Sequence, residues 1–165
     1  MRESEGRLPE VYVQPGESHL VTEPTIMRTL LGSCVGIAFR VPRLAAAALC
    51  HPMLPKCPVK TAKGLTLAAG RRYVDFAIRD LARQFDSLGA RRTEVQVKLF
   101  GGADVLTVPT STSRPTVGRQ NLETALRVLA EEGFEVAASS LGGAKGLNLR
   151  FDTGTGEVQV RRLGS

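Results

Sequence analysis

Two apolar stretches separated by a chain-breaking dipeptide constrain the fold of this chain more than any other feature. The first follows Gly32-Ser33 and ends at Phe39, and the second covers residues 44–50. Pro42 and Arg43 stand between them, and proline lacks the N–H group that a helix interior or a central strand needs. Stretches of this length with a breaker between them favour two adjacent antiparallel strands. We therefore expect a core built around a β-sheet.

The remaining segments carry further strand and helix signals. Alternation of apolar and polar residues predicts strands at 10–14, 94–100 and 134–138, and a hairpin of 147–151 with 157–160. Apolar steps of three and four predict a helix over 71–88 and a second helix that begins near Asn121, a possible N-cap, and ends before Gly133. Six or more strands, mostly antiparallel or mixed, with two main helices on one side, correspond to a layered α+β fold.

Length and apolar patterning limit the class of protein. The chain of 165 residues suits a single domain, 1–165, in which residues 1–9 form a flexible N-terminal segment. Its longest aliphatic run, residues 44–50, is far shorter than the roughly 20 residues of a membrane-spanning helix. The first residues alternate in charge and lead into no apolar stretch, which is unlike a secretory signal. We expect a cytoplasmic protein without membrane insertion.

The net charge of +6 and the pI near 9.7 raise the question of an acidic partner. The basic residues fall as scattered pairs without interleaved aromatic residues, so a nucleic-acid partner is not expected. An arginine-rich solvated surface and an acidic protein partner both remain compatible with this charge.

The three cysteines, Cys34, Cys50 and Cys57, are an odd number in a chain without an export signal, so a disulfide framework is not expected. Together with His51 they offer no Cys-x-x-Cys unit for zinc. We expect no metal ion and no other cofactor.

Cys34 and His51 are the residues whose spacing suggests chemistry. Cys34 follows Gly32-Ser33, where backbone N–H groups can face its sulfur as an oxyanion hole. Seventeen residues separate it from His51, which suits one strand running down and the next returning. An imidazole beside a thiol promotes the nucleophilic thiolate, and a hydroxyl such as that of Thr29 can hold the imidazole. On spacing alone, such a cysteine is more often a small buried hydrophobic residue than a nucleophile, and a histidine at a strand end is commonly just hydrogen-bonded.

Ordered blocks along the chain resemble the CheD family of chemoreceptor glutamine deamidases. The blocks are 29–35, 51–55, 72–75, 98–103, 117–118 with Asn121, and 142–158. The resemblance implies an α/β/β layered fold and a catalytic triad of Cys34, His51 and Thr29, although the alternative register for the threonine falls on Arg28. It also implies deamidation of selected glutamines on cytoplasmic helices of methyl-accepting chemoreceptors, and binding to a CheC-type phosphatase.

In the mechanism this resemblance implies, Cys34 attacks a glutamine carboxamide, His51 protonates the departing ammonia, and water hydrolyses the thioester. The residues expected to line the substrate or oxyanion site are Gly32, Ser33, Gly101 and Gly102. Basic residues are expected to rim this site and steer an acidic receptor helix toward it. A glutamate methyl ester is a further possible substrate of the same site.

Two other functions remain open, and four substitutions bear on them. The chain carries Val41, Gln120, Ser140 and Leu147 where family members commonly have charged residues. The chain is alternatively a weakly active or inactive binding module that engages a CheC-type phosphatase or receptors. A different thiol hydrolase, or a redox sensor, would use Cys34 without needing His51.

Overall fold

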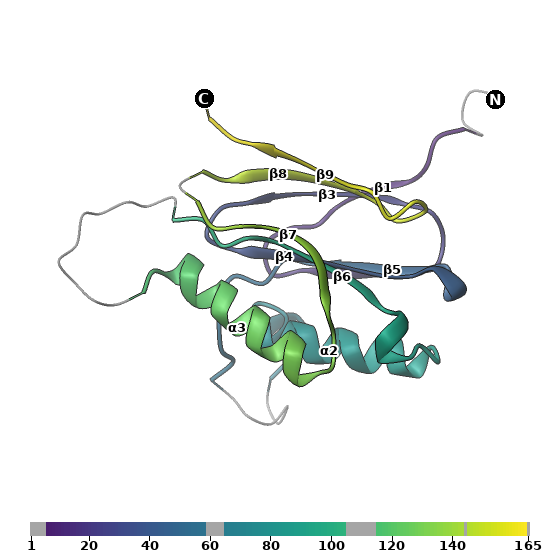
Figure 1. Cartoon of the computed structure of the whole chain (residues 1–165), viewed down its shortest axis with the longest axis horizontal. Helices are drawn as coiled ribbons and strands as arrows, with labels where there is room; N and C mark the ends of the chain where they lie inside the picture. The colour runs from purple at the N-terminus through teal and green to yellow at the C-terminus, as the bar shows by residue number, and fades with distance from the viewer. Residues whose placement is uncertain (1–5, 59–64, 105–114, 144, 165) are drawn as a thin grey trace.

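The computed structural model describes residues 6–58, 65–104, 115–143 and 145–164. Two β-sheets and one layer of helices are stacked on one another, so that a five-stranded sheet lies between a four-stranded outer sheet and the helices (Figure 1). The flexible segment expected at 1–9 falls partly on residues 1–5, outside the described residues. Pro9, the last residue of this segment, is held by a hydrogen bond, because Ile26 N donates to Pro9 O at 2.9 Å.

The outer sheet has the strand order β1-β3-β8-β9. Its strands are β1 (Glu10–Tyr12), β3 (Ile26–Leu31), β8 (Leu147–Asp152) and β9 (Val158–Arg162). β1 pairs with β3 in parallel, whereas β8 pairs with both β3 and β9 in antiparallel fashion. The predicted C-terminal hairpin is therefore confirmed.

The middle sheet comprises β2 (Ser18–Val21), β4 (Val35–Val41), β5 (Ala46–Cys50), β6 (Gln96–Gly101) and β7 (Val136–Leu141). β4 and β5 are antiparallel neighbours, as the two apolar stretches predicted. The breaker forms a short 3₁₀ turn (Pro42–Leu44), after which Ala45 takes a left-handed conformation with φ of 52°. β7 runs parallel to β6, so this sheet is mixed.

Two strands, β2 and β3, were absent from the sequence prediction. β2 is a short edge strand whose residues are all half-buried, so it has no clear alternation of apolar and polar positions. β3 lies directly before Gly32, outside the apolar stretch that predicted β4. Its pairing partners, β1 and β8, are distant in sequence, and local patterns carry no information about them.

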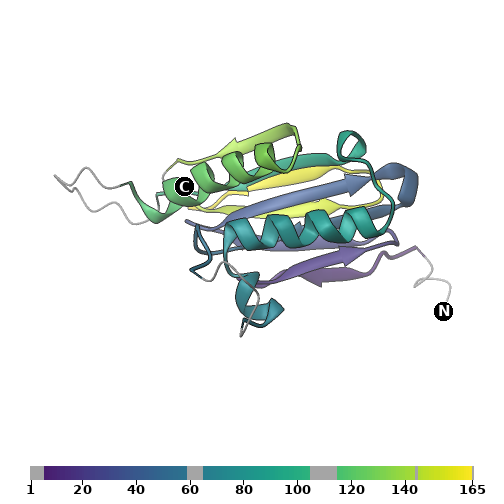
Figure 2. The same cartoon turned by 90° about the horizontal axis from the view of Figure 1, so that it is seen from below.

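Helices α2 (Val74–Ser87) and α3 (Val117–Glu131) cover the face of the middle sheet that is turned away from the outer sheet (Figure 2). A short helix, α1 (Leu67–Gly70), precedes them in the chain. The prediction of Asn121 as an N-cap was wrong. Thr116 caps α3, because its Oγ1 accepts a hydrogen bond from Arg119 N at 3.2 Å. Asn121 instead lies inside the helix and is fully buried. No helix in the described ranges is long and apolar enough to span a membrane.

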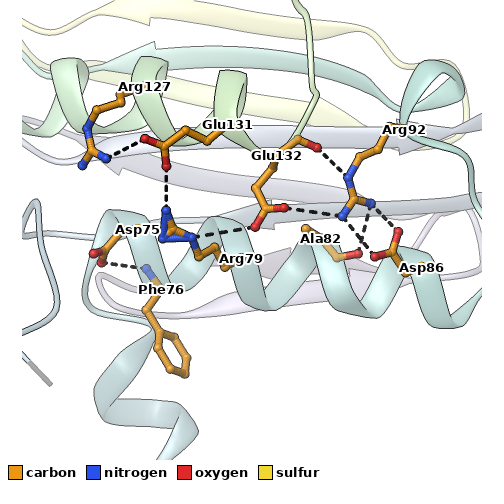
Figure 3. Close-up of polar contacts among 9 residues, drawn as sticks. All are labelled: Asp75, Phe76, Arg79, Ala82, Asp86, Arg92, Arg127, Glu131 and Glu132. Carbon is orange, nitrogen blue, oxygen red and sulfur yellow. Dashed lines mark hydrogen bonds and ion pairs between the residues drawn. The ribbon is translucent and has the colours of Figure 1, made fainter. Parts of the chain in front are cut away.

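Ion pairs fix α3 against α2 and use several of the basic side chains (Figure 3). Arg79 Nη2 lies 2.8 Å from Glu131 Oε2, and Arg92 pairs with Asp86. The Arg92 guanidinium also lies 4.9 Å from the centroid of the Phe134 ring, within the range of a cation–π contact. This network holds the helix layer that carries one wall of the site described below.

Two apolar clusters fill the spaces between the layers. One lies between the helices and the middle sheet and is centred on Phe39, whose ring centroid lies 5.9 Å from that of Phe85 and 5.6 Å from that of Phe134. The other lies between the two sheets and includes Met27, Leu31, Ala38, Leu49, Phe100, Leu149 and Phe151.

Truncation of Phe39 tests the importance of the helix-side cluster. We expect Phe39→Ala to lower the free energy of unfolding by about 3–5 kcal/mol, because it leaves a cavity among fully buried neighbours. Leu126→Ala is the matched control on α3, where the side chain is 44% exposed and the expected loss is within roughly 0.5 kcal/mol. Urea denaturation measures both, and equal losses would contradict the assignment of the core.

Candidate active site

Cys34 and His51 lie on the same face of the middle sheet. Val35 and Cys50, their neighbours in sequence, both pack on the helix side, so alternation turns Cys34 and His51 toward the outer sheet. The pairing of Ile37 with Cys50 makes Cys34 and His51 diagonal neighbours across the two chain segments. Cys34 packs against the cluster between the sheets, as this orientation requires.

Thr29 reaches the same space from the opposite sheet. Its neighbours on β3, Met27 and Leu31, belong to the cluster between the sheets, and Thr29 itself is fully buried. Its Oγ1 lies 2.7 Å from His51 Nδ1. Arg28, in the alternative register, points to the other face and contacts Glu10.

The hydrogen bonds of Thr29 determine the tautomer of His51. The single hydroxyl proton of Thr29 is donated to Val13 O at 2.7 Å, so Oγ1 must accept from His51 Nδ1. The proton of the neutral ring therefore resides on Nδ1, and Nε2 carries the free lone pair. The His51 backbone is also fixed, since its N–H donates to Glu17 O and its oxygen accepts from Gly16 N.

Burial keeps both His51 and Cys34 in their neutral forms. Desolvation lowers the pKa of His51 from 6.5 to about 4, and the nearby backbone carbonyl of Val13 opposes the shift. Desolvation also raises the pKa of the Cys34 thiol, although the N–H of the same residue lowers it in part. Within the described part of the chain, no hydrogen bond joins Cys34 to His51. The resting pair is thus a thiol beside an imidazole rather than an ion pair.

The three carbonyl groups of residues 32–34 all accept hydrogen bonds that hold this loop in place. Gly32 O accepts from Ala103 N at 3.0 Å, Ser33 O from the side chain of Asn121 at 2.9 Å, and Cys34 O from Gly102 N at 2.8 Å. No backbone acceptor for the N–H groups of residues 32–34 occurs among the described residues. Free N–H groups beside a nucleophile are the donors that an oxyanion hole requires.

Gly101 and Gly102, at the end of β6, pack against the loop of residues 32–34. Gly102 uses its N–H to hold Cys34 O, so that N–H is not available to an oxyanion. Gly101 has φ of 95°, and a Cβ at this position would overlap Cys34 O. Of the four residues predicted to line the site, only Ser33 is part of the groove described next, whereas Gly32, Gly101 and Gly102 act through their backbones.

An open groove of about 450 Å³ leads from the surface to Cys34. Its lining comes from the loop of residues 32–34, the segment after His51, the segment after β6 and the start of α3. The lining residues are Ser33, Cys34, Met53, Leu54, Ala103, Asp104, Thr116, Val117 and Gly118. Sequence reasoning did not assign Met53, Leu54 and Val117 to the site, because isolated apolar residues in loops and at a helix start resemble ordinary surface positions.

The groove lining lacks the predicted basic residues. Asp104 is its one carboxylate, and the described lining contains no lysine or arginine. Arg72 lies beside the groove, where its backbone oxygen accepts from Met53 N and Leu54 N. Small and apolar residues therefore make up most of the described lining.

The other two cysteines are separated from this arrangement. Cys50 is fully buried on the helix side of β5, and burial raises its pKa to about 12. The backbone N–H of Cys57 donates to Asp75 Oδ1 at 2.9 Å. All three cysteines are free thiols, and no cluster of metal-ligating side chains occurs in the described ranges.

The four substituted family positions are outside the groove lining. Val41 and Leu147 are buried in the two cores, and Gln120 donates to Pro115 O at 2.9 Å. Ser140 lies on β7 opposite Phe100. None of the four is among the residues that line the groove.

The fold is thus a three-layer sandwich with a thiol, an imidazole and a hydroxyl at the junction of its two sheets. Residues 53–162 match the family described as "CheD chemotactic sensory transduction". A Geobacter sulfurreducens protein named "Probable chemoreceptor glutamine deamidase CheD 2" is 44% identical over 157 residues, which are 95% of this chain and 92% of that protein. A Maridesulfovibrio salexigens protein, "Probable chemoreceptor glutamine deamidase CheD", is 34% identical over 99% of this chain and 97% of its own length. The chain belongs to the CheD family, which confirms the resemblance.

Acidification tests the state of His51. Between pH 6.5 and pH 4 the unfolded chain binds a proton at this histidine that the folded chain does not, so stability falls as pH drops. We expect His51 to account for a loss of about 3 kcal/mol over this range. Urea denaturation of the wild type and of His51→Gln at several pH values isolates the contribution of His51 to the free energy of unfolding. Identical pH dependence of the two proteins would contradict a neutral, buried His51.

Proposed function

We propose that this protein deamidates glutamine side chains of chemoreceptors, with Cys34 as the nucleophile, His51 as the base and acid, and Thr29 as the residue that orients the imidazole. One observation carries the proposal: the hydrogen bonds from His51 through Thr29 to Val13 O leave Nε2 unprotonated on the face of the sheet that also bears Cys34. The names of the relatives supply the class of substrate.

In the first half of the reaction the glutamine carboxamide becomes a thioester. His51 Nε2 takes the thiol proton as the sulfur of Cys34 attacks the carboxamide carbon, and the free N–H groups of residues 32–34 receive the oxyanion. The protonated imidazole then gives its proton to the departing ammonia. Water, deprotonated by the same nitrogen, hydrolyses the thioester, so that glutamate leaves and the thiol is restored.

The starting pair is neutral, which favours an amide substrate that arrives uncharged. A preformed ion pair would have to survive in a buried space, where desolvation penalises both charges. If the proton moves from Cys34 to His51 only during the attack, the two charges form only once the substrate is in place. The free protein then carries no such penalty. A glutamate methyl ester presents the same uncharged carbonyl, so we include methylesterase activity as a second reaction of this site.

The groove fits a side chain presented by a helix on the surface of a larger protein. It is open, and Leu54 and Val117 expose 38% and 45% of their surface beside it. The cytoplasmic helices of methyl-accepting chemoreceptors are the proposed partner, with the cytoplasm as the compartment. The family resemblance further suggests a CheC-type phosphatase as a second partner of this face.

Deamidation by the wild type and by two variants tests the proposal. A receptor fragment incubated with the protein is expected to gain the mass difference between a carboxamide and a carboxylic acid at defined glutamines. Cys34→Ala should abolish this change, and His51→Ala should slow it by roughly 10²–10⁴-fold, the usual contribution of general acid–base catalysis.

Cys50→Ala is the matched control, because this thiol lies on the other face of the sheet. Far-UV circular dichroism establishes that each variant is folded. Unchanged conversion by Cys34→Ala or by His51→Ala would refute the mechanism. Absence of conversion by the wild type, with tight binding of the fragment, would favour the binding-module function.

Replacement of Thr29 tests the orienting hydroxyl. We expect Thr29→Val to lower kcat by about 10²-fold, since an imidazole free to rotate loses its alignment with Cys34. Thr29→Ser keeps the hydroxyl and should remain close to wild type. Steady-state deamidation kinetics separate the two, and equal rates for the valine and serine variants would show that the hydroxyl has no role.

A further inference from the structure

Asn121 is a buried amide that joins the two loops of the candidate site. Its Nδ2 donates to Ser33 O at 2.9 Å and to Met53 O at 3.0 Å, and the residue has no exposed surface. Ser33 immediately precedes Cys34, and Met53 follows His51 by two residues. One NH₂ group therefore spans the loop of the nucleophile and the loop of the base.

The two carbonyl partners fix the orientation of this amide. Both are acceptors, so the NH₂ group must face them, and the buried Oδ1 finds no hydrogen-bond partner among the described residues. Asparagine is also a weak helix former, yet Asn121 lies inside α3. A buried unpaired acceptor at a helical position is unfavourable, so helix stability alone does not account for this residue.

A glycine one turn earlier allows the helix to reach the two loops. A Cβ on Gly118 would lie only 2.7 Å from Gly102 O, so a side chain here would push α3 away from the end of β6. The close approach brings Asn121 within hydrogen-bond distance of Ser33 O and Met53 O. Helix α3 thus supplies both a wall of the groove and the link between its two reactive segments.

We propose that Asn121 is a positioning residue for the reaction, and this inference rests on the proposed function. By holding Ser33 O and Met53 O at one point, it fixes the separation between the Cys34 sulfur and His51 Nε2. Asn121 is not among the residues that line the groove, so it affects the alignment of the reacting groups rather than the binding of substrate. Its loss therefore lowers kcat and leaves KM nearly unchanged.

Asn121→Ala is compared with Thr124→Ala, a change of another buried polar residue of α3, which is 5% exposed. Both variants are assayed for deamidation of the receptor fragment well below their melting temperatures. Asn121→Ala should lose roughly 10²-fold in kcat, the effect of a misplacement of about 1 Å, whereas Thr124→Ala should keep its kcat. Unchanged kcat in Asn121→Ala, or equal losses in both variants, overturns the proposal.

Hydrogen exchange measures the link without any substrate. Amides in segments 29–36 and 51–55 should exchange faster in Asn121→Ala than in wild type, and neither segment should change in Thr124→Ala. If the wild type does not deamidate, the proposed function fails, and exchange alone then decides the role of Asn121. Faster exchange in both segments supports the link, and unchanged exchange in either one overturns it.

Asn121→Asp provides a second variant of almost the same shape in case the alanine variant does not fold. An ionised carboxylate cannot donate to the two carbonyl groups, but its protonated form can donate to one of them. The ratio of its kcat to that of wild type should therefore rise as pH is lowered from about 8 to about 6, because burial and two carbonyl neighbours raise the pKa of this carboxyl group. A flat ratio overturns the proposal.

Discussion

The register between β4 and β5 is the constraint on which the site depends. Ile37 pairs with Cys50, and a slip of one residue would turn His51 toward the helices and Cys50 toward the outer sheet. Both faces of β5 are buried, so burial alone does not select this register. The turn selects it: Ala45 N donates to Pro42 O at 3.1 Å, and the left-handed Ala45 begins β5 at a fixed residue. A tight turn thus determines which side chain meets Thr29.

Much of this architecture could be predicted from local sequence. The periodicity of α2 and the hairpin of β8 and β9 are local properties, and Pro42 between two apolar stretches indicated the β4–β5 pair. The same β4–β5 strand pair led to the prediction that Cys34 and His51 lie side by side. The position of Thr29 could not be derived in this way, because its inward orientation depends on β3, which is stabilised by strands from both ends of the chain.

The misassignment of Asn121 has a related cause. Asparagine is common at N-caps, so a local interpretation placed the start of the helix at Asn121. The helix instead begins at Val117, after the N-cap Thr116. Asn121 is distinguished by its hydrogen bonds to the carbonyl groups of Ser33 and Met53, two residues that are remote from it in sequence. The groove is equally non-local, since four separate segments contribute to it. Sequence patterns therefore indicated Cys34 and His51, the proposed nucleophile and base, but not the residues that surround them.

The distribution of charge bears on how such a site would release its product. Arginines such as Arg79 and Arg92 are engaged in ion pairs on the helix layer, and the groove itself carries a carboxylate, Asp104. In the proposed reaction an uncharged amide becomes an anion beside Asp104 and beside an imidazole that burial holds neutral. No cation in the described lining compensates the new charge. In that reaction, repulsion and desolvation would both oppose retention of the glutamate, so the same groove would favour the uncharged substrate over its product.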